Sequence, residues 1–285
     1  MKALTFPVVL AVLALPACAS QSSPSFAPAA PPVVTQALPA QNAGYAGEAN
    51  VEAACPVPDM NYPGAPKCYA LLRTDAGAYA GHVPSATKAP DGYGPSDIRS
   101  AYNLPSTGGK GQTVGIVDFA DDPNAESDLA VYRKQYGLPA CTTQNGCFHK
   151  VNQFGNSKHF PKPRRGWAGE ISIDLDMASA TCPQCHILLV EAGTSGNTAE
   201  NEAVTLGSDV VSNSWGYYGN RPRDKAFDHP GHVILVASGD TGYQALPTVP
   251  DSFRTVVSVG GTDLHHATNA RGWTETAWRG STSEC

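Results

Sequence analysis

The stretch WAGEISIDLDMASATCPQCHILLVEA, from Trp167 to Ala192, decides the fold that this sequence predicts. Its first part, Trp167 to Thr181, is predicted to form a crossover helix. The apolar run His186 to Val190 that follows is typical of a strand covered on both faces. A helix that leads directly into such a strand indicates a parallel sheet, and the same alternation recurs along the chain after Tyr93.

Five apolar runs rich in Val or Ile are predicted to be the parallel strands. They are Gln112–Val117, His186–Val190, Asp209–Ser212, Val233–Ala237 and Arg254–Val259. The helices expected between them are Asn124–Tyr136, Trp167–Thr181 and Thr198–Leu206. Because crossovers between parallel strands are right-handed, we expect an α/β fold with a doubly wound parallel sheet and a functional site at the carboxyl ends of its strands.

The N-terminus has the pattern of an export signal. One lysine precedes an apolar run over residues 3–16 that is too short to span a bilayer. LPAC at residues 15–18 fits a lipobox, in which a lipidated Cys18 would tether the protein to a membrane, and it also fits an ordinary cleavage site. Both alternatives predict a signal peptide over residues 1–18 and an extracellular or cell-surface protein.

Composition divides the rest of the chain. Residues 19–47 are mostly Ala, Pro, Ser, Gln and Val without a charged residue, which predicts a flexible linker. A short N-terminal segment, 48–91, follows, and residues 92–285 are predicted to be one domain. The formal net charge of −6, with scattered Lys and Arg, argues against nucleic acid as a partner. We expect a monomer.

The eight cysteines of an exported chain are expected to form disulfides. Their spacing favours three local pairs without fixing the connectivity: Cys55–Cys68, Cys141–Cys147 and Cys182–Cys185. Cys285 is left over if Cys18 is lipidated or removed, which implies a partner on another chain or on further sequence. A redox dithiol or half a zinc site is the alternative for Cys182–Cys185, and its position between a helix and an apolar strand argues against both.

The candidate chemistry lies on the helix of the opening stretch. Glu170 and Asp174 are four residues apart, so both carboxylates lie on one helix face, where two ionised acids would repel each other. A solvated helix face is the structural alternative. The apolar neighbours of the two acids favour a partly buried site with raised carboxyl pKa values. These neighbours are Ile171, Ile173, Leu175 and Met177.

A third acid follows a predicted strand. Asp240 lies in VILVASGDTG at the carboxyl end of Val233–Ala237, where catalytic groups of α/β sheets gather. Gly239 and Gly242 permit a tight turn there. The alternative for Asp240 is an aspartate that only caps this turn.

Several stretches together resemble the sedolisin family of serine-carboxyl peptidases, from about Tyr93 to Cys285. They are GYGPSDIRSAYNLP at 92–105, GQTVGIVDFADDPNAESDLAVYRKQYGLP at 111–139, the opening stretch, and VVSNSWG at 210–216, followed by ASGDTGY, VVSVGGTDL and GWTETAW. The resemblance implies a subtilisin-like fold and peptide or protein substrates. It also implies three roles: Glu170 as general base, Asp174 as the acid that orients it, and Asp240 as oxyanion-hole donor.

These implied roles have a physical basis. A serine hydroxyl is a weak nucleophile until a base takes its proton, and a carboxylate with a raised pKa can be that base. An aspartic acid donates a hydrogen bond to an oxyanion only while it is protonated, so we expect activity at acid pH. We set Asp118 aside as a residue that, with Asp121 and Asp122, shapes a loop. Trp215 and Ser238 are predicted to line the site or to support its backbone.

The sequence departs from the family pattern near its end. The family's nucleophilic serine, in a Gly-Thr-Ser stretch, and its calcium loop are expected beyond Cys285. The predicted fold is therefore incomplete at the C-terminus, calcium is expected only for the complete domain, and no metal ligand is assigned in this chain. Ser283, in GSTS at 280–283, is not assigned as the nucleophile.

Three interpretations of the chain remain open. In the first, it is a fragment or frameshifted copy of a secreted endopeptidase. In the second, it is an exported product without catalytic activity that binds peptides or surface partners. In the third, it is an acid hydrolase that uses only carboxylates, as glycosidases do, although two acids on one helix are poorly placed to flank a glycosidic bond.

Overall fold

The computed structural model describes residues 51–55, 65–73, 92–219, 223–240, 242–243 and 247–283, all within one unit, Pro39–Glu284. The predicted signal peptide, the linker, the lipidation site and Cys285 lie outside the described residues. Among the described helices, none is both long and apolar enough to cross a membrane.

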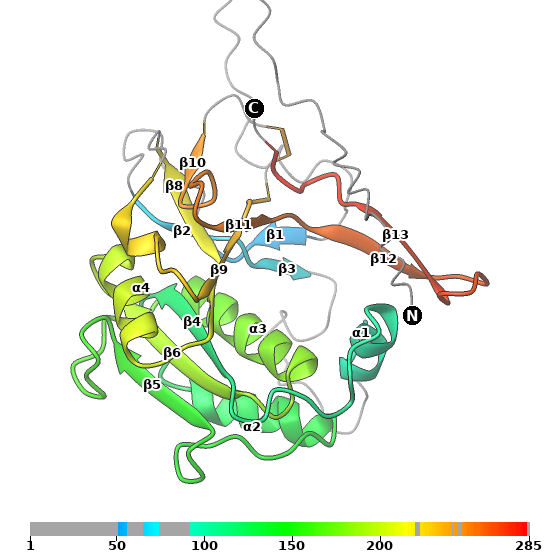
Figure 1. The fold of residues 1–285 in the computed structure, drawn as a ribbon, viewed down its shortest axis with the longest axis horizontal. Coiled ribbons are helices and arrows are strands. Elements are labelled where there is room, and N and C mark those ends of the chain that lie inside the picture. The colour runs from blue at the N-terminus through cyan, green and yellow to red at the C-terminus, as the bar shows by residue number, and fades with distance from the viewer. Residues whose placement is uncertain are drawn as a thin grey trace, which may run out of the picture. The chain divides into compact units, whose positions relative to one another are not determined.

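A parallel sheet of six strands forms the centre of the fold (Figure 1). Its order is β11-β9-β7-β4-β6-β5, so the chain winds outward from β4 in both directions. The strands are β4 (Thr113–Phe119), β5 (Phe148–Asn152), β6 (His186–Ala192), β7 (Val210–Asn213), β9 (Val233–Ala237) and β11 (Val257–Val259). The predicted α/β fold with a doubly wound parallel sheet is confirmed. Its switch point lies at the carboxyl ends of β4 and its neighbours β6 and β7.

The edge strands differ from the sequence prediction. β5 was not predicted, because His149 and Lys150 interrupt its apolar pattern. Lys150 forms ion pairs with Asp121 at 2.5 Å and with the buried Glu191 at 3.1 Å. A strand at the sheet edge tolerates these polar residues because it is covered less completely. At the opposite edge, β11 begins at Val257, later than the predicted start at Arg254.

Helices cover both faces of the sheet (Figure 1). They are α1 (Pro95–Ala101), α2 (Ala125–Gln135), α3 (Arg165–Thr181) and α4 (Gly196–Thr205), with a 3₁₀ turn at Lys225–Phe227. The three predicted crossover helices are confirmed to within two residues at each end. The short α1 was not predicted, although Pro95 at its first turn is a typical start signal.

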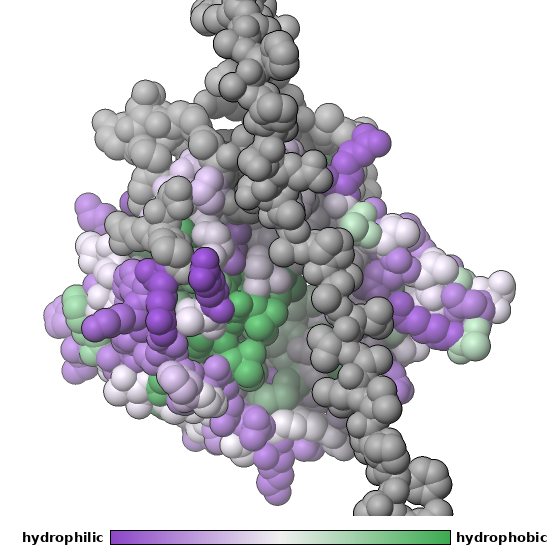
Figure 2. Space-filling model, turned by 45° about the horizontal axis from the view of Figure 1, so that its top comes forward, coloured by the Kyte–Doolittle hydropathy of each residue, from purple (hydrophilic) through white to green (hydrophobic). Residues whose placement is uncertain are grey.

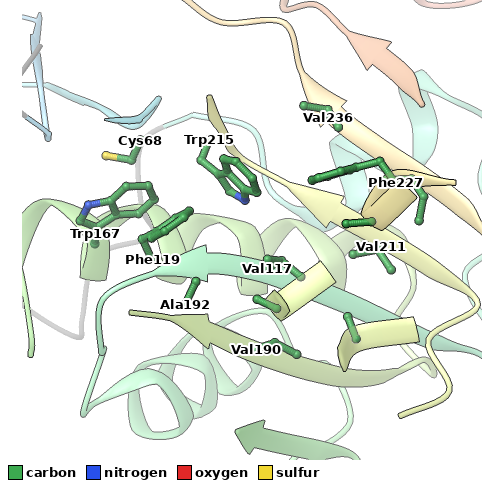
Figure 3. Close-up of a cluster of buried hydrophobic side chains, with 14 of the residues drawn as sticks. Cys68, Val117, Phe119, Trp167, Val190, Ala192, Val211, Trp215, Phe227 and Val236 are labelled. Carbon is green, nitrogen blue, oxygen red and sulfur yellow. The ribbon is translucent and has the colours of Figure 1, made fainter. Parts of the chain in front are cut away.

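Two hydrophobic cores separate the faces. The core under α2 and α3 includes Ile116, Leu129, Ile171 and Leu189. The core under α4 is larger and extends to a group of aromatic rings (Figure 3). Its labelled members are Cys68, Val117, Phe119, Trp167, Val190, Ala192, Val211, Trp215, Phe227 and Val236. Alternation along β4 sends Ile116 to the first core and Val117 to the second.

Smaller antiparallel pairings complete the described fold. β8 (Trp215–Tyr218) pairs with β10 (Thr248–Val249) on one side and with β2 (Lys67–Cys68) on the other. β1 (Val51–Ala53) pairs with β3 (Leu71–Arg73), and β12 (Thr262–His266) with β13 (Trp273–Ala277). None of these pairings was predicted.

The three local disulfides predicted from the sequence are present: Cys55–Cys68, Cys141–Cys147 and Cys182–Cys185. The disulfide state of Cys182–Cys185 agrees with a structural role for this CxxC. In the described part of the chain, no cluster of His, Cys, Asp or Glu side chains could hold a metal ion.

Candidate active site

Helix α3 presents Glu170 and Asp174 to the carboxyl edge of the sheet. Trp167, Ile171 and Leu175 recur every four residues on its buried face and fix its rotation against the sheet. The Trp167 ring packs on Phe119 at 5.4 Å between centroids. This packing leaves Glu170 only 4% exposed, so the structure contradicts the alternative of a solvated acidic face.

The predicted apolar surroundings of these acids are only half present. Ile171 and Leu175 are buried, as expected. Ile173 and Met177 are 46% and 37% exposed, because the helical period turns them away from the sheet. The seclusion of Glu170 therefore depends on contacts from outside the helix.

Glu170 is held by the N-terminal part of the chain. Its Oε2 atom accepts the backbone N–H of Tyr69 at 2.6 Å and the backbone N–H of Ala70. Burial and the charge of Asp174 raise the pKa of Glu170 well above its usual value, and the two N–H groups oppose that rise. In its ionised form this carboxyl is a stronger base than an ordinary glutamate.

Asp118 forms part of the same carboxyl cluster. It is fully buried on β4, two residues after Ile116, and therefore faces α3. Burial and the charges of Asp174 and Glu170 raise its pKa well above the usual value. Neither Asp118 oxygen meets hydrogen-bond geometry with a described group, yet the side chain lies close enough to couple its protonation to that of Asp174.

Asp174 is the third member of this cluster. Burial raises its pKa to about 6, while the neighbouring Ser214 and Asp118 side chains oppose the rise. Several ionised carboxylates cannot stay buried side by side without a proton between them, so protons are shared within the cluster. When two carboxyls share one proton, the ionised carboxyl can act as a base while the protonated one donates a hydrogen bond to it.

The position of Asp118 corrects the sequence interpretation, which set it aside as a loop residue. Asp121 and Asp122 do belong to a loop: Asp121 pairs with Lys150, and the N–H of Asp122 donates to Glu191 at 2.8 Å. Asp118 lies earlier in the chain, within strand β4 of the sheet. Its spacing of two from Ile116 was the signal that could have placed it on the α3 side.

Asp240 lies in the turn that follows β9. Gly239 and Gly242 have φ angles of 104° and 69°, so the predicted tight turn is confirmed. Burial raises the pKa of Asp240 to about 7, although the charge of Lys67 lowers it. The charge of Asp240 also contributes to the raised pKa of Glu170. The three predicted site residues are thus brought to one place.

The segment GSTS at 280–283 runs along the Asp240 turn. The N–H of Thr282 donates to the Gly239 carbonyl at 2.9 Å, and the N–H of Gly242 donates to the Gly280 carbonyl at 2.8 Å. Ser281 Oγ accepts the N–H of Gly261 at 3.0 Å. Ser283 is exposed and pairs through its backbone with Tyr243.

Trp215 and Ser238, predicted to line the site or support its backbone, are both buried. The Trp215 ring packs edge-on against Phe119 at 5.1 Å and belongs to the core under α4 (Figure 3). Apolar side chains are visible in a hollow on one face of the molecule, bordered by hydrophilic ones (Figure 2).

Comparisons with known proteins add one informative likeness. No protein-family model matches the sequence, and no curated protein matches it. The fold is similar to that of Pseudomonas sedolisin, a serine-carboxyl proteinase solved in complex with pseudo-iodotyrostatin, with a TM-score of 0.55 and 21% identity. That likeness covers 66% of this chain and 58% of the other, so the chain spans less than two thirds of that protein's length.

A second likeness is weaker. The epidermin leader peptide processing serine protease of Staphylococcus aureus matches with a TM-score of 0.41 and 14% identity over 63% of this chain and 54% of that one. The sedolisin match establishes the fold alone, a subtilisin-like α/β fold around a parallel sheet.

Proposed function

We propose that this chain carries the acid–base machinery of an exported serine-carboxyl endopeptidase that hydrolyses peptide bonds at acid pH. One observation carries the proposal: Glu170 and Asp174 meet the buried Asp118 at the carboxyl edge of a parallel sheet, and all three carboxyls have raised pKa values. Groups with matched, raised pKa values in one place are what proton transfer to and from a peptide substrate requires.

The three predicted roles fit this cluster. Glu170 is the general base that takes the proton of a serine hydroxyl, and Asp174 orients it and shares its proton. Asp240 donates a hydrogen bond to the oxyanion that forms on the attacked carbonyl. Because the pKa of Asp240 is about 7, the donor form predominates below that pH and is lost above it. The proposal therefore predicts acid activity.

The serine nucleophile is the component that the proposal still requires. The hydrogen bonds to Glu170 Oε2 come from the backbone amides of Tyr69 and Ala70, not from a hydroxyl. The resemblance to sedolisins leads us to expect the serine and the calcium loop in sequence that follows Cys285.

Export is part of the proposal. Three disulfides in the described chain support an oxidising compartment, where such bonds persist. The signal peptide at residues 1–18 and a lipid tether at Cys18 are proposed from the sequence alone.

A second candidate function is peptide binding without hydrolysis. One observation favours it: β2 already lies against β8 as an added antiparallel strand, which is a common mode of peptide recognition.

An assay with an unfolded protein substrate tests the first proposal. The protein, produced with the serine-bearing segment that is expected after Cys285, is incubated with reduced, alkylated lysozyme from pH 3 to pH 8, and the products are identified by mass spectrometry. We expect cleavage below pH 6, and its loss in Glu170→Gln. Equal cleavage by Glu170→Gln, or more cleavage at pH 8 than at pH 5, contradicts the assigned roles. Absence of cleavage at every pH by the protein that includes the serine segment contradicts the peptidase proposal and favours the binding function.

A further inference from the structure

We propose that the N-terminal cover, residues 51–55 and 65–73, occupies the edge of β8 where extended peptides bind, and that Lys67 fills a pocket for a basic side chain of such a peptide. The site is then closed by its own chain until a peptide takes the place of β2. This inference deepens the proposed function and rests on it for the identity of the site.

The backbone pairing supports this assignment. β2 runs antiparallel to β8, with Lys67 opposite Gly216 and Cys68 opposite Trp215. Because β10 pairs with the other side of β8, β2 takes the one remaining edge of that strand. An extended peptide recognised by strand addition would need this same edge. The two cannot bind together.

The cover also engages the proposed general base. The N–H groups of Tyr69 and Ala70 both point at Glu170 Oε2. Both amides occupy the same carboxylate oxygen and oppose the rise in the pKa of Glu170, so the cover weakens this carboxylate as a base. The tyrosine ring closes the same region, since an added Cβ at Gly216 would lie 2.3 Å from the Tyr69 hydroxyl oxygen.

Lys67 is buried in a pocket that suits a cation. It is 7% exposed, and its Nζ atom lies 5.3 Å from the centroid of the Tyr69 ring and 5.5 Å from that of Tyr218. The carboxyl groups of Asp240 and Asp251 act on it electrostatically. Asp251 is oriented by the Thr248 hydroxyl, which donates to its Oδ1 at 2.7 Å. A buried ammonium needs such compensation, and the groups outside the cover, Tyr218, Asp240 and Asp251, would hold a lysine or arginine of an incoming peptide.

Two features join the two parts of the cover to each other. The disulfide Cys55–Cys68 links them, and the N–H of Ala54 donates to the Ala70 carbonyl at 2.9 Å. Ala54 also crosses Gly166 so closely that an added Cβ there would lie 2.2 Å from its carbonyl oxygen. The cover therefore docks only because residue 166 is glycine.

This close approach provides a matched pair of variants. Gly166→Ala places a methyl group where the cover runs, whereas Gly169→Ala adds the same methyl group on the same helix with nothing within 4 Å. Both changes raise helix propensity equally. A difference between them therefore reports contact with the cover.

The probe is a fluorescein-labelled peptide with the sequence of residues 65–72, in which serine replaces Cys68, and binding is measured by fluorescence anisotropy at pH 5. We expect Gly166→Ala to bind it at least tenfold more tightly than the unaltered protein and Gly169→Ala. A second peptide, with norleucine in place of Lys67, should lose at least fivefold in affinity for Gly166→Ala. Equal binding by all three proteins contradicts the proposal that the cover occupies the peptide site. Equal binding of both peptides contradicts the proposal that Lys67 fills a pocket for a basic side chain.

Hydrogen exchange on the unaltered chain gives a result that does not depend on the variant folding. Saturating peptide should remove protection from the amides of Lys67 to Ala70 and leave those of α3 protected. Protection that persists at Tyr69 and Ala70 while peptide is bound would place the peptide elsewhere and overturn the inference. Cleavage is scored separately by mass spectrometry, with the protein that includes the serine segment expected after Cys285: peptide exchange without cleavage contradicts the peptidase proposal and leaves the inference about the cover standing.

Discussion

Helices α3 and α4 cover opposite faces of the sheet, and each buries a glutamate. Glu170 on α3 is 4% exposed and Glu200 on α4 is 0% exposed. Burial raises the pKa of both, that of Glu200 to about 8. Their surroundings differ. Glu170 lies among other acids and contacts the backbone of the cover, whereas Glu200 lies beside Asn213 and neither of its oxygens meets hydrogen-bond geometry with a described group.

This comparison separates burial from function. A raised pKa by itself marks a desolvated carboxyl, and both faces of the sheet have one. Only on the α3 face do several carboxyls share protons at a point where a peptide backbone already binds. We therefore propose a catalytic role for Glu170 and not for Glu200, which we regard as a buried acid that makes the stability of the fold depend on pH.

The largest expected effect tests this distinction by activity. Glu170→Gln keeps the shape of the side chain but removes the base, and general-base catalysis contributes roughly 10² to 10⁴ in rate. In the protein that includes the serine segment expected after Cys285, we expect peptide hydrolysis at pH 5 to fall by about a thousandfold, and Glu200→Gln to change it less than threefold. The measurement is kcat/KM on one fluorogenic peptide. Equal losses in the two variants would remove the distinction between the faces.

The next effect concerns the stability of the fold. Glu200 ionises near pH 4.5 in the unfolded chain but only near 8 in the folded protein. Between these two pH values the folded protein keeps a proton on Glu200 that the unfolded chain has lost. The free energy of unfolding is therefore highest below pH 4.5 and declines as the pH rises towards 8. At pH 7 the loss is roughly 3 kcal/mol, which Glu200→Gln should recover.

Urea unfolding of the two proteins at pH 4 and pH 7 measures this difference. The variant should unfold at a higher urea concentration than the unaltered protein at pH 7, and the gap should narrow at pH 4. A gap of the same size at both values would show that Glu200 does not stay protonated in the folded state.

The smallest effect sharpens the description of the α3 face. The charge of Lys67 lowers the pKa of Asp240, so Lys67→Met should raise it above its value of about 7. Because other groups and solvent also screen Asp240, we expect a rise of about half a pH unit. Carbon-13 NMR titration of the aspartate carboxyls measures the pKa of Asp240. The control is Lys150→Met, because Lys150 pairs with Asp121 and Glu191 instead. An unchanged Asp240 titration would mean that Lys67 does not act on the site.

Much of the fold could be predicted because its signals are local. The apolar runs of β6 and β9, the 3.6-residue period of α3 and the short cysteine spacings each lie within one stretch of chain. Within the site, Glu170 and Asp174 were predictable from their spacing on one helix. Asp240 was predictable from its place after a buried strand.

The remaining parts of the site depend on residues far apart in sequence. Asp118 joins the cluster because β4 lies beneath α3, and Lys67 reaches Asp240 because β2 pairs with β8. A two-residue strand such as β2 has no period that a sequence pattern could detect. Only the docked chain places it.

The sequence alone determined the order of the five predicted parallel strands and three crossover helices, favoured the three local disulfides, and placed two acids on one face of α3. These follow from periodicity and short spacing, which act within a few residues. The tertiary structure alone decided which acids share protons, how far their pKa values rise, and that the N-terminal cover lies on Glu170. Desolvation and long-range pairing produce these features, and both come into being only when distant segments pack together.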